Sequence, residues 1–272
     1  MIKHFLNPPN WFTAASIFCS VYAMSLVIAA PEITSEVLSR ACVLVIFGGI
    51  FDLLDGRVAR MTKRFSEFGV QLDSIADIVG FGVAPALLAW AWVLKDMGPI
   101  GVAITFWYVL CAAFRLARFN VNTTDKTWTL RGHSQGLTST MAGGCLVTLI
   151  WVSNGYLAGI HIPAFAVAAT VAALGLLMVS SIPYRNFRDF KGNRVARRLI
   201  GIGLASCLMG AIFLDPSMWW GVGAVGYLLV GLIDGLVVAM HQRILSRALM
   251  LDEIFEDNVT EALEEYDVME VE

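Results

Sequence analysis

Long apolar segments separated by short polar ones dominate the pattern of this chain. A helix needs roughly 20 mostly apolar residues to cross the hydrocarbon core of a bilayer. The pattern predicts an all-α, polytopic membrane helix bundle with about eight transmembrane helices, the first of them retained rather than cleaved. The predicted spans are residues 11–30, 36–56, 70–94, 98–118, 136–158, 162–182, 197–214 and 218–240.

The composition supports a membrane protein. Hydrophobic residues make up 57% of the 272 residues and charged residues 15%, whereas soluble domains have about 45–50% and about 25%. These values exclude an ordinary soluble enzyme, a nucleic-acid-binding protein and a disordered chain. The five cysteines lie inside apolar segments without the spacing of a metal or disulfide framework, so we expect small buried side chains there.

The charges divide the chain into a membrane-embedded domain, residues 1–250, and an acidic tail, residues 251–272. The tail carries ten acidic residues and no Lys or Arg, whereas the domain carries twelve acidic residues and nineteen basic ones. Seventeen of those nineteen fall on one face of the predicted bundle, and Arg40 and Lys95 are the exceptions. The positive-inside rule makes that face cytoplasmic. An even number of spans then places both termini and the tail in the cytoplasm.

Four of the twelve acidic residues in the membrane domain lie within 26 positions of one another. Asp52 and Asp55 are near the cytoplasmic end of the second predicted span, and Asp73 and Asp77 are near the start of the third. Spacings of three and four residues place each pair on one helix face. The connection between the two spans is short, so all four carboxylates are expected to converge just inside the cytoplasmic boundary. Carboxylates at membrane depth are costly and usually functional.

Four converging carboxylates repel one another unless cations neutralise them. Hard divalent ions such as Mg²⁺ or Mn²⁺ prefer oxygen ligands of this kind. Two such ions between four carboxylates are typical of phosphoryl chemistry, in which the ions clamp the phosphate oxygens. No His or Cys lies near the cluster, which argues against zinc.

The neighbouring residues allow two interpretations each. Small residues beside the acids either permit close helix packing or let a ligand approach. Arg60 either binds phosphate or marks the cytoplasmic end of its span. Arg115 and Arg118, three residues apart, either end the fourth span or bind a carboxylate or phosphate.

Together these residues form the pattern Asp52-x2-Asp55-Gly56-x2-Ala59-Arg60-x8-Gly69-x3-Asp73-x3-Asp77. The pattern resembles the signature of the CDP-alcohol phosphatidyltransferase family without a departure, and Pro9-Asn10-x2-Thr13 is similar to the start of many members. The resemblance covers about residues 8–190. Residues 66–74, 81–86, 114–120 and, more weakly, 181–184 are similar to the branch of that family that acts on L-serine.

The resemblance implies transfer of the phosphatidyl group of CDP-diacylglycerol to the hydroxyl of L-serine, with release of CMP. It implies a homodimer with its active site at the cytoplasmic face, in a bacterial inner membrane, and with membrane lipid but no nucleic acid as a partner. Asp52, Asp55 and Asp73 would hold two Mg²⁺ or Mn²⁺ ions. Asp77 would be the general base, with a share in metal binding. The CDP-lipid would contact Gly56, Ala59, Arg60 and Gly69, and the serine carboxylate or a phosphate would contact Arg115 and Arg118.

The sequence leaves two alternatives to this function. A sibling transferase could use glycerol phosphate, inositol phosphate or another alcohol, since Arg115 and Arg118 could also serve a phosphorylated acceptor. An ion-coupled transporter would place its acids near the bilayer midplane and repeat its broken helices in two halves. Here the acids gather at one end of two spans and no strong repeat is visible, which disfavours the transporter.

Overall fold

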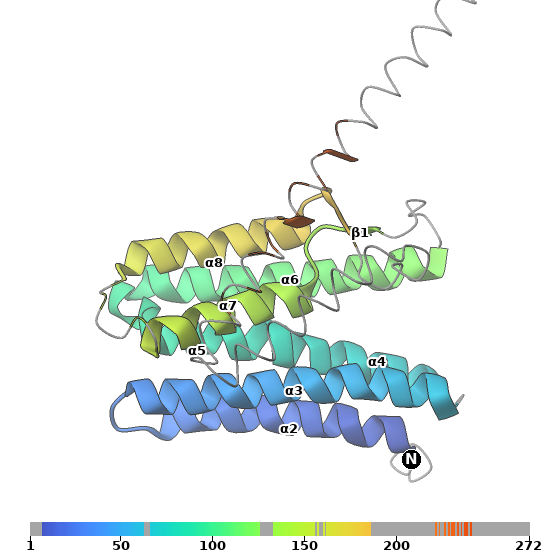
Figure 1. Ribbon diagram of the computed structural model, residues 1–272, viewed down its shortest axis with the longest axis horizontal. Coiled ribbons are helices and arrows are strands. Elements are labelled where there is room, and N and C mark those ends of the chain that lie inside the picture. Colours follow the sequence, from blue (N-terminus) through green and yellow to red (C-terminus); the bar gives the residue numbers. More distant parts are fainter. Residues whose placement is uncertain are drawn as a thin grey trace, which may run out of the picture.

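The computed structural model describes residues 7–62, 66–125, 133–155 and 162–185, with residues 157 and 160 and separate positions between 221 and 240. This part of the chain is mainly helical (Figure 1). The helices are α2 (Pro8–Ala29), α3 (Ser35–Thr62), α4 (Glu67–Asp77), the π-helix η1 (Ile78–Val83), α5 (Ala84–Trp92), the 3₁₀-helix η2 (Leu94–Met97), α6 (Pro99–Asp125), α7 (Ser139–Asn154) and α8 (Ala164–Val179).

Four helical stretches in the described residues are long and apolar enough to cross a membrane. They are α2, α3, the run from α4 through η1 to α5, and α6, and they match the first four predicted spans. The prediction of a helical membrane protein is therefore confirmed. α7 and α8 occupy the fifth and sixth predicted spans with 16 residues each, which is about 24 Å of helix.

The described residues do not test the remaining predictions about the membrane spans. The seventh predicted span and the acidic tail lie outside the described residues, and the eighth is represented by separate helical positions between 221 and 240. The total of eight spans and the cytoplasmic placement of both termini therefore stay predictions.

Local sequence explains where several helices begin. α2 begins with proline, whose fixed φ suits the first helical turn. Ser66 caps α4 by accepting a hydrogen bond of 3.0 Å from the Gly69 backbone N–H. Thr138 caps α7 in the same way through the backbone N–H of Met141, at 3.4 Å.

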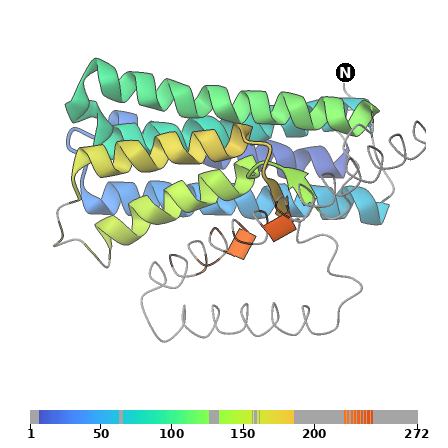
Figure 2. The same ribbon diagram turned by 90° about the horizontal axis from the view of Figure 1, so that it is seen from above.

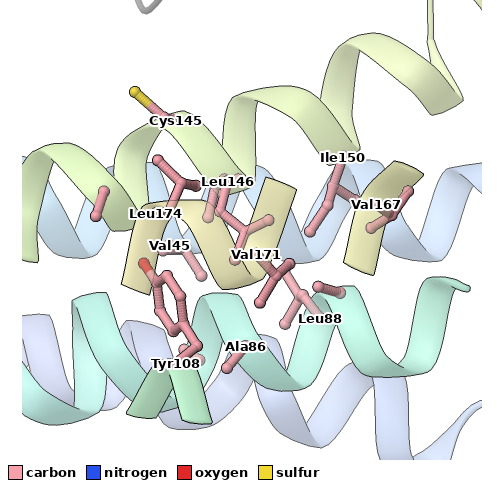
Figure 3. Packing of buried hydrophobic residues seen from close by; sticks show 14 of the residues in the cluster. Val45, Ala86, Leu88, Tyr108, Cys145, Leu146, Ile150, Val167, Val171 and Leu174 are labelled. Atoms are coloured by element: carbon pink, nitrogen blue, oxygen red, sulfur yellow. The ribbon is translucent and has the colours of Figure 1, made fainter. Parts of the chain in front are cut away.

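The helices pack as two groups around a common core. α2 and α3 form an antiparallel hairpin, and α8 runs alongside α6 (Figures 1 and 2). α7 contacts both α3 and α5 and so connects the groups. The core also includes buried residues of α2 and α3. Between α5, α6, α7 and α8, side chains such as Leu88, Tyr108, Leu146 and Val171 are completely buried (Figure 3). The four cysteines in the described residues are buried and form no disulfide with one another, as expected.

The π-helical turn η1 follows directly after Asp77. Two neighbours hold it: the Tyr108 hydroxyl donates a hydrogen bond of 3.3 Å to the Phe81 carbonyl, and Gly143 of α7 lies against the same carbonyl. A Cβ atom at Gly143 would be 2.8 Å from the Phe81 oxygen, so this approach requires glycine. Single π-helical turns are frequent near functional sites. Here the turn lies within the third predicted span, immediately after Asp77 of the acid cluster.

A small two-stranded sheet departs from the purely helical prediction. Strand β1 (His133–Gln135) pairs antiparallel with β2 (Pro183–Arg185), with Ser134 opposite Tyr184. The sheet joins the segment before α7 to the segment after α8. A Cβ atom at Gly235 would be 2.4 Å from the Pro183 carbonyl oxygen, so the last described helical segment lies against β2.

Candidate active site

The structure brings the predicted aspartates together at one end of the bundle. Carboxylate oxygens of Asp52, Asp55 and Asp73 lie within 4.8 Å of one another, and the Asp77 carboxyl group contacts that of Asp52. α3 supplies the first two and α4 the second two. The C-terminal end of α3, the N-terminal end of α4 and the C-terminal end of α6 lie at the same end of the molecule (Figure 1). The spacing argument from the sequence thus predicted the correct neighbours.

The four acids differ in exposure. Asp55 is buried, Asp52 and Asp77 are half-buried, and Asp73 is exposed. The cluster therefore extends from the solvent-exposed surface into the protein interior. Such a set of oxygen donors fits a hard divalent cation, because the converging negative charges are then neutralised by the ligand they bind.

Thr13 of α2 holds the most buried acid of the cluster. Its hydroxyl donates a hydrogen bond of 2.7 Å to Oδ2 of Asp55. The sequence singled out the Pro9-Asn10-x2-Thr13 segment by resemblance alone and assigned Thr13 no contact. A signal for it exists in the spacing of the polar residues that α2 turns toward the protein interior, which are Asn10, Thr13, Ser16 and Ser20.

A cavity of about 210 Å³ adjoins the acids. All four residues predicted to contact the CDP-lipid line it, together with Asp55 and Asp73. The lining comes from α2, α3 and the start of α4: Pro9, Asn10, Thr13, Asp55, Gly56, Ala59, Arg60, Ser66, Gly69, Val70 and Asp73. A larger hollow of about 700 Å³ lies at the α2–α3 connection, lined by Tyr22, Thr34 and neighbours. It contains no member of the acid cluster, so the smaller cavity is the candidate substrate site.

Arg115 approaches the cluster from α6. Its side chain is buried, at 7% exposure, and it interacts electrostatically with Asp77. The guanidinium donates a hydrogen bond of 3.0 Å to Oγ of Ser139, the first residue of α7. It also lies 5.4 Å from the centre of the Phe119 ring. A buried cation thus faces one acid of the cluster.

Arg118 points elsewhere, although its spacing predicts the same helix face as Arg115. Among the described residues its hydrogen bonds go to backbone carbonyls at the end of α8 and in β1. The structure therefore separates the predicted pair, with Arg115 beside Asp77 and Arg118 at the α8 terminus. Long side chains three residues apart share a face at Cβ, but their charged ends can diverge by several ångströms.

Two asparagines of α6 also lie in this region: the sequence grouped Asn120 with Arg115 and Arg118 as one polar cluster, whereas it gave no prediction for Asn122. Asn120 donates a hydrogen bond of 3.2 Å to Oγ of Ser74, the residue after Asp73. Asn122 donates one of 3.1 Å to the side chain of Gln135 in β1. The signal for both is their position in the polar last turns of a helix that ends beside the acids.

Comparison with known proteins identifies the family of this chain. Residues 6–183 match the model of the family described as CDP-alcohol phosphatidyltransferase. The chain therefore belongs to the CDP-alcohol phosphatidyltransferase family and is a membrane-embedded enzyme of that class.

Individual relatives extend the similarity. The chain is 38% identical over 236 residues to the CDP-diacylglycerol–serine O-phosphatidyltransferase of Helicobacter pylori, covering 84% of this chain and 92% of the relative. It is 35% identical over 150 residues to the Bacillus subtilis protein of the same name, covering 55% and 77%. It is 36% identical over 149 residues to the archaetidylserine synthase of Methanothermobacter thermautotrophicus, covering 54% and 58%.

Proposed function

We propose that this protein transfers the phosphatidyl group of CDP-diacylglycerol to the hydroxyl of L-serine, giving phosphatidylserine and CMP. The observation that carries the proposal is the meeting of Asp52, Asp55 and Asp73 beside a cavity lined by the other signature residues. The choice of serine is supported by relatives from bacteria and an archaeon whose names specify serine transferases or a serine-lipid synthase.

We propose that this donor set binds two divalent cations, Mg²⁺ or Mn²⁺, as the family resemblance implies. Asp52, Asp55 and Asp73 would hold them, and Asp77, in contact with Asp52, would share in the binding. Thr13 would fix the orientation of the Asp55 carboxylate through its hydrogen bond. When bound, the ions supply charge stabilisation to the phosphate oxygens and to the departing CMP.

Asp77 is the proposed general base. It contacts Asp52 and interacts electrostatically with the Arg115 guanidinium, so an acceptor bound by Arg115 would be close to this base. The serine oxygen attacks the phosphorus that bears diacylglycerol, its proton passes to an Asp77 oxygen, and the bond from phosphorus to CMP breaks in line, with CMP keeping the electron pair. A positioned base of this kind contributes roughly 10²–10⁴ in rate.

Substrate binding is divided between two sides of the cluster. The CDP-lipid would occupy the cavity along α2, α3 and α4, with Gly56, Ala59 and Gly69 leaving room and Arg60 pairing with phosphate. We assign the acceptor carboxylate to Arg115, whose buried guanidinium faces Asp77. A carboxylate held there would bring the hydroxyl of the same amino acid toward the base.

The proposed enzyme has a defined orientation in the membrane and forms a homodimer. The C-terminal parts of α3 and α6, which lie at the same end of the molecule as the acids, carry Arg57, Arg60, Arg115 and Arg118. Arg40 lies near the start of α3. This distribution supports a site at the cytoplasmic face of a bacterial inner membrane. A homodimer is expected from the family resemblance, and cross-linking in native membranes tests it.

The decisive experiment supplies purified full-length protein with CDP-diacylglycerol, Mg²⁺ or Mn²⁺, and a panel of acceptors. The panel contains L-serine, glycerol 3-phosphate, inositol 1-phosphate and glycerol, and CMP release and the lipid product are measured together. CMP release with serine alone, with phosphatidylserine as product, supports the proposal. Release with a phosphorylated alcohol but not with serine assigns the protein to a sibling activity, and an Asp52→Asn variant controls for background hydrolysis.

A further inference from the structure

We propose that Arg118 is a positioning residue of the acceptor site. Its guanidinium fastens the C-terminus of α8 and the turn before α7 onto α6, and so sets the Ser139–Arg115 pair beside Asp77. This inference rests on the proposed function, in which Arg115 binds the acceptor carboxylate. It gives Arg118 a role different from contact with a substrate.

The first support is the set of partners of the guanidinium. Nη1 donates to the carbonyl of Val179 at 2.7 Å. Nη2 lies at 2.9 Å from the carbonyls of Gln135 and Met178 and at 3.1 Å from that of Ser180. One side chain of α6 thus binds both the end of α8 and the end of β1.

The second support is the hydrogen-bond inventory of the α8 terminus. The last four carbonyls of a helix have no partner inside it. Here Leu176 accepts from the Ser180 backbone N–H at 2.9 Å and Leu177 from that of Leu137 at 3.0 Å. Arg118 satisfies the last two, Met178 and Val179, and its positive charge suits the negative end of the helix dipole. Removing the guanidinium would leave these two carbonyls without that donor.

The third support is the turn between β1 and α7. Gly136 has φ +76°, and a Cβ atom there would be 2.5 Å from the Met178 oxygen and 2.9 Å from Nη2 of Arg118. The backbone N–H of Gly136 donates a hydrogen bond of 2.9 Å to the Ile182 carbonyl. The turn is therefore packed directly under the guanidinium, and it continues through the helix cap Thr138 to Ser139.

These contacts form a continuous path from one arginine to the other. Arg118 holds the turn, the turn sets the start of α7, and Ser139 at that start binds the Arg115 guanidinium. A shift of about 1 Å in a substrate-positioning group can cost roughly 10²-fold in rate. Loss of Arg118 should therefore weaken acceptor binding much more than CDP-lipid binding, because the CDP-lipid cavity is built from α2, α3 and α4.

The test compares Arg118→Gln, Arg118→Lys and Gly136→Ala in the purified full-length protein. Gly136→Ala disturbs the turn while keeping the guanidinium. We expect Arg118→Gln and Gly136→Ala each to raise the KM for serine about tenfold or more, with the KM for CDP-diacylglycerol changed less than about twofold. Arg118→Lys should lie between, because an ammonium lacks the planar fork that reaches several carbonyls. The Arg118→Gln/Gly136→Ala double variant should be little worse than either single one.

Two controls make the outcomes separable. Arg40→Gln removes an exposed arginine of α3 that pairs with Glu36 and should keep both KM values. Arg115→Lys tests the proposed function itself: an unchanged serine KM there would reject the acceptor assignment whatever Arg118 shows. If the acceptor panel identifies another alcohol, the proposed function fails, and the KM for that alcohol then tests Arg118.

Three results would overturn the positioning role. A raised serine KM in Arg118→Gln with normal kinetics in Gly136→Ala would indicate direct substrate contact by Arg118. Equal increases in the KM for serine and for CDP-diacylglycerol would indicate a general structural defect. Normal serine KM values in both Arg118 variants would remove the role altogether, and Arg118→Lys keeps this test available if the glutamine variant does not fold.

Discussion

The hydroxyl of Thr13 donates a 2.7 Å hydrogen bond to the Asp55 carboxylate, which ties the first span to the acid cluster. Thr13 is 3% exposed and Asp55 is 6% exposed, so the contact is shielded from water. A carboxylate held in this way has its orientation fixed before any ligand arrives. The first span is thus part of the site as well as part of the bundle.

Thr13→Val should weaken metal binding without removing any metal ligand. Valine has nearly the same shape as threonine but cannot orient the Asp55 carboxylate. Substitution of groups that orient metal ligands typically costs about 10–100-fold in metal affinity or activity. We expect the Mg²⁺ or Mn²⁺ concentration for half-maximal CMP release to rise by a factor in that range.

Thr13→Ser is the matched control for this prediction, because it keeps the hydroxyl and should retain a near-normal metal requirement. An unchanged metal titration in Thr13→Val would show that the hydrogen bond does not orient a metal ligand.

Asp77→Asn should abolish turnover while largely preserving binding of the CDP-lipid. Asparagine keeps the size of the side chain but cannot take a proton, so the rate should fall by about 10²–10⁴. CMP release measures the turnover, and binding of a labelled CDP-lipid to the same preparation measures the first step. Glu67→Gln, an exposed acid-to-amide change in the first turn of the same helix, should stay active. Wild-type turnover in Asp77→Asn would reject Asp77 as the base.

Removal of divalent cations should stop the reaction reversibly. Asp52, Asp55 and Asp73 place oxygens within 4.8 Å of one another, and such a set binds hard cations in preference to soft ones. CMP release should disappear in excess EDTA and return when Mg²⁺ or Mn²⁺ is added above the chelator concentration. Activity that persists in excess EDTA would remove the proposed divalent cations from the mechanism.

The parts of the fold that depend on local sequence could be predicted from it. Apolar run length located the first four spans, and helical spacing with a short connection placed Asp52 and Asp55 against Asp73 and Asp77. The span ends were less accurate: α3 continues to Thr62 and α6 to Asp125, beyond the predicted 56 and 118. Hydropathy marks where a segment leaves the membrane, but a helix can continue through polar residues into water.

The parts that depend on distant contacts could not be predicted. η1 departs from an ordinary α-helix where Tyr108 and Gly143 meet the Phe81 carbonyl, and neither neighbour is near it in sequence. β1 and β2 are three residues each and pair across some 50 positions. The divergence of Arg115 from Arg118 is of the same kind, because it follows from where α7 and α8 end and not from the spacing in α6.

Gly143→Ala should test whether the π-helical turn supports the site. The added Cβ would lie 2.8 Å from the Phe81 oxygen and 3.0 Å from its Cα, and backbone atoms cannot move aside cheaply. Overpacking of this kind costs about 1–3 kcal/mol, so thermal unfolding in detergent should begin at a lower temperature. CMP release below that temperature should also fall, because η1 directly follows Asp77.

Gly144→Ala is the matched control: its Cβ would meet nothing within 4 Å among the described residues, and alanine favours helix by up to about 1 kcal/mol. Equal stability and activity in the two variants would show that the contact between α7 and η1 does not support the catalytic acid.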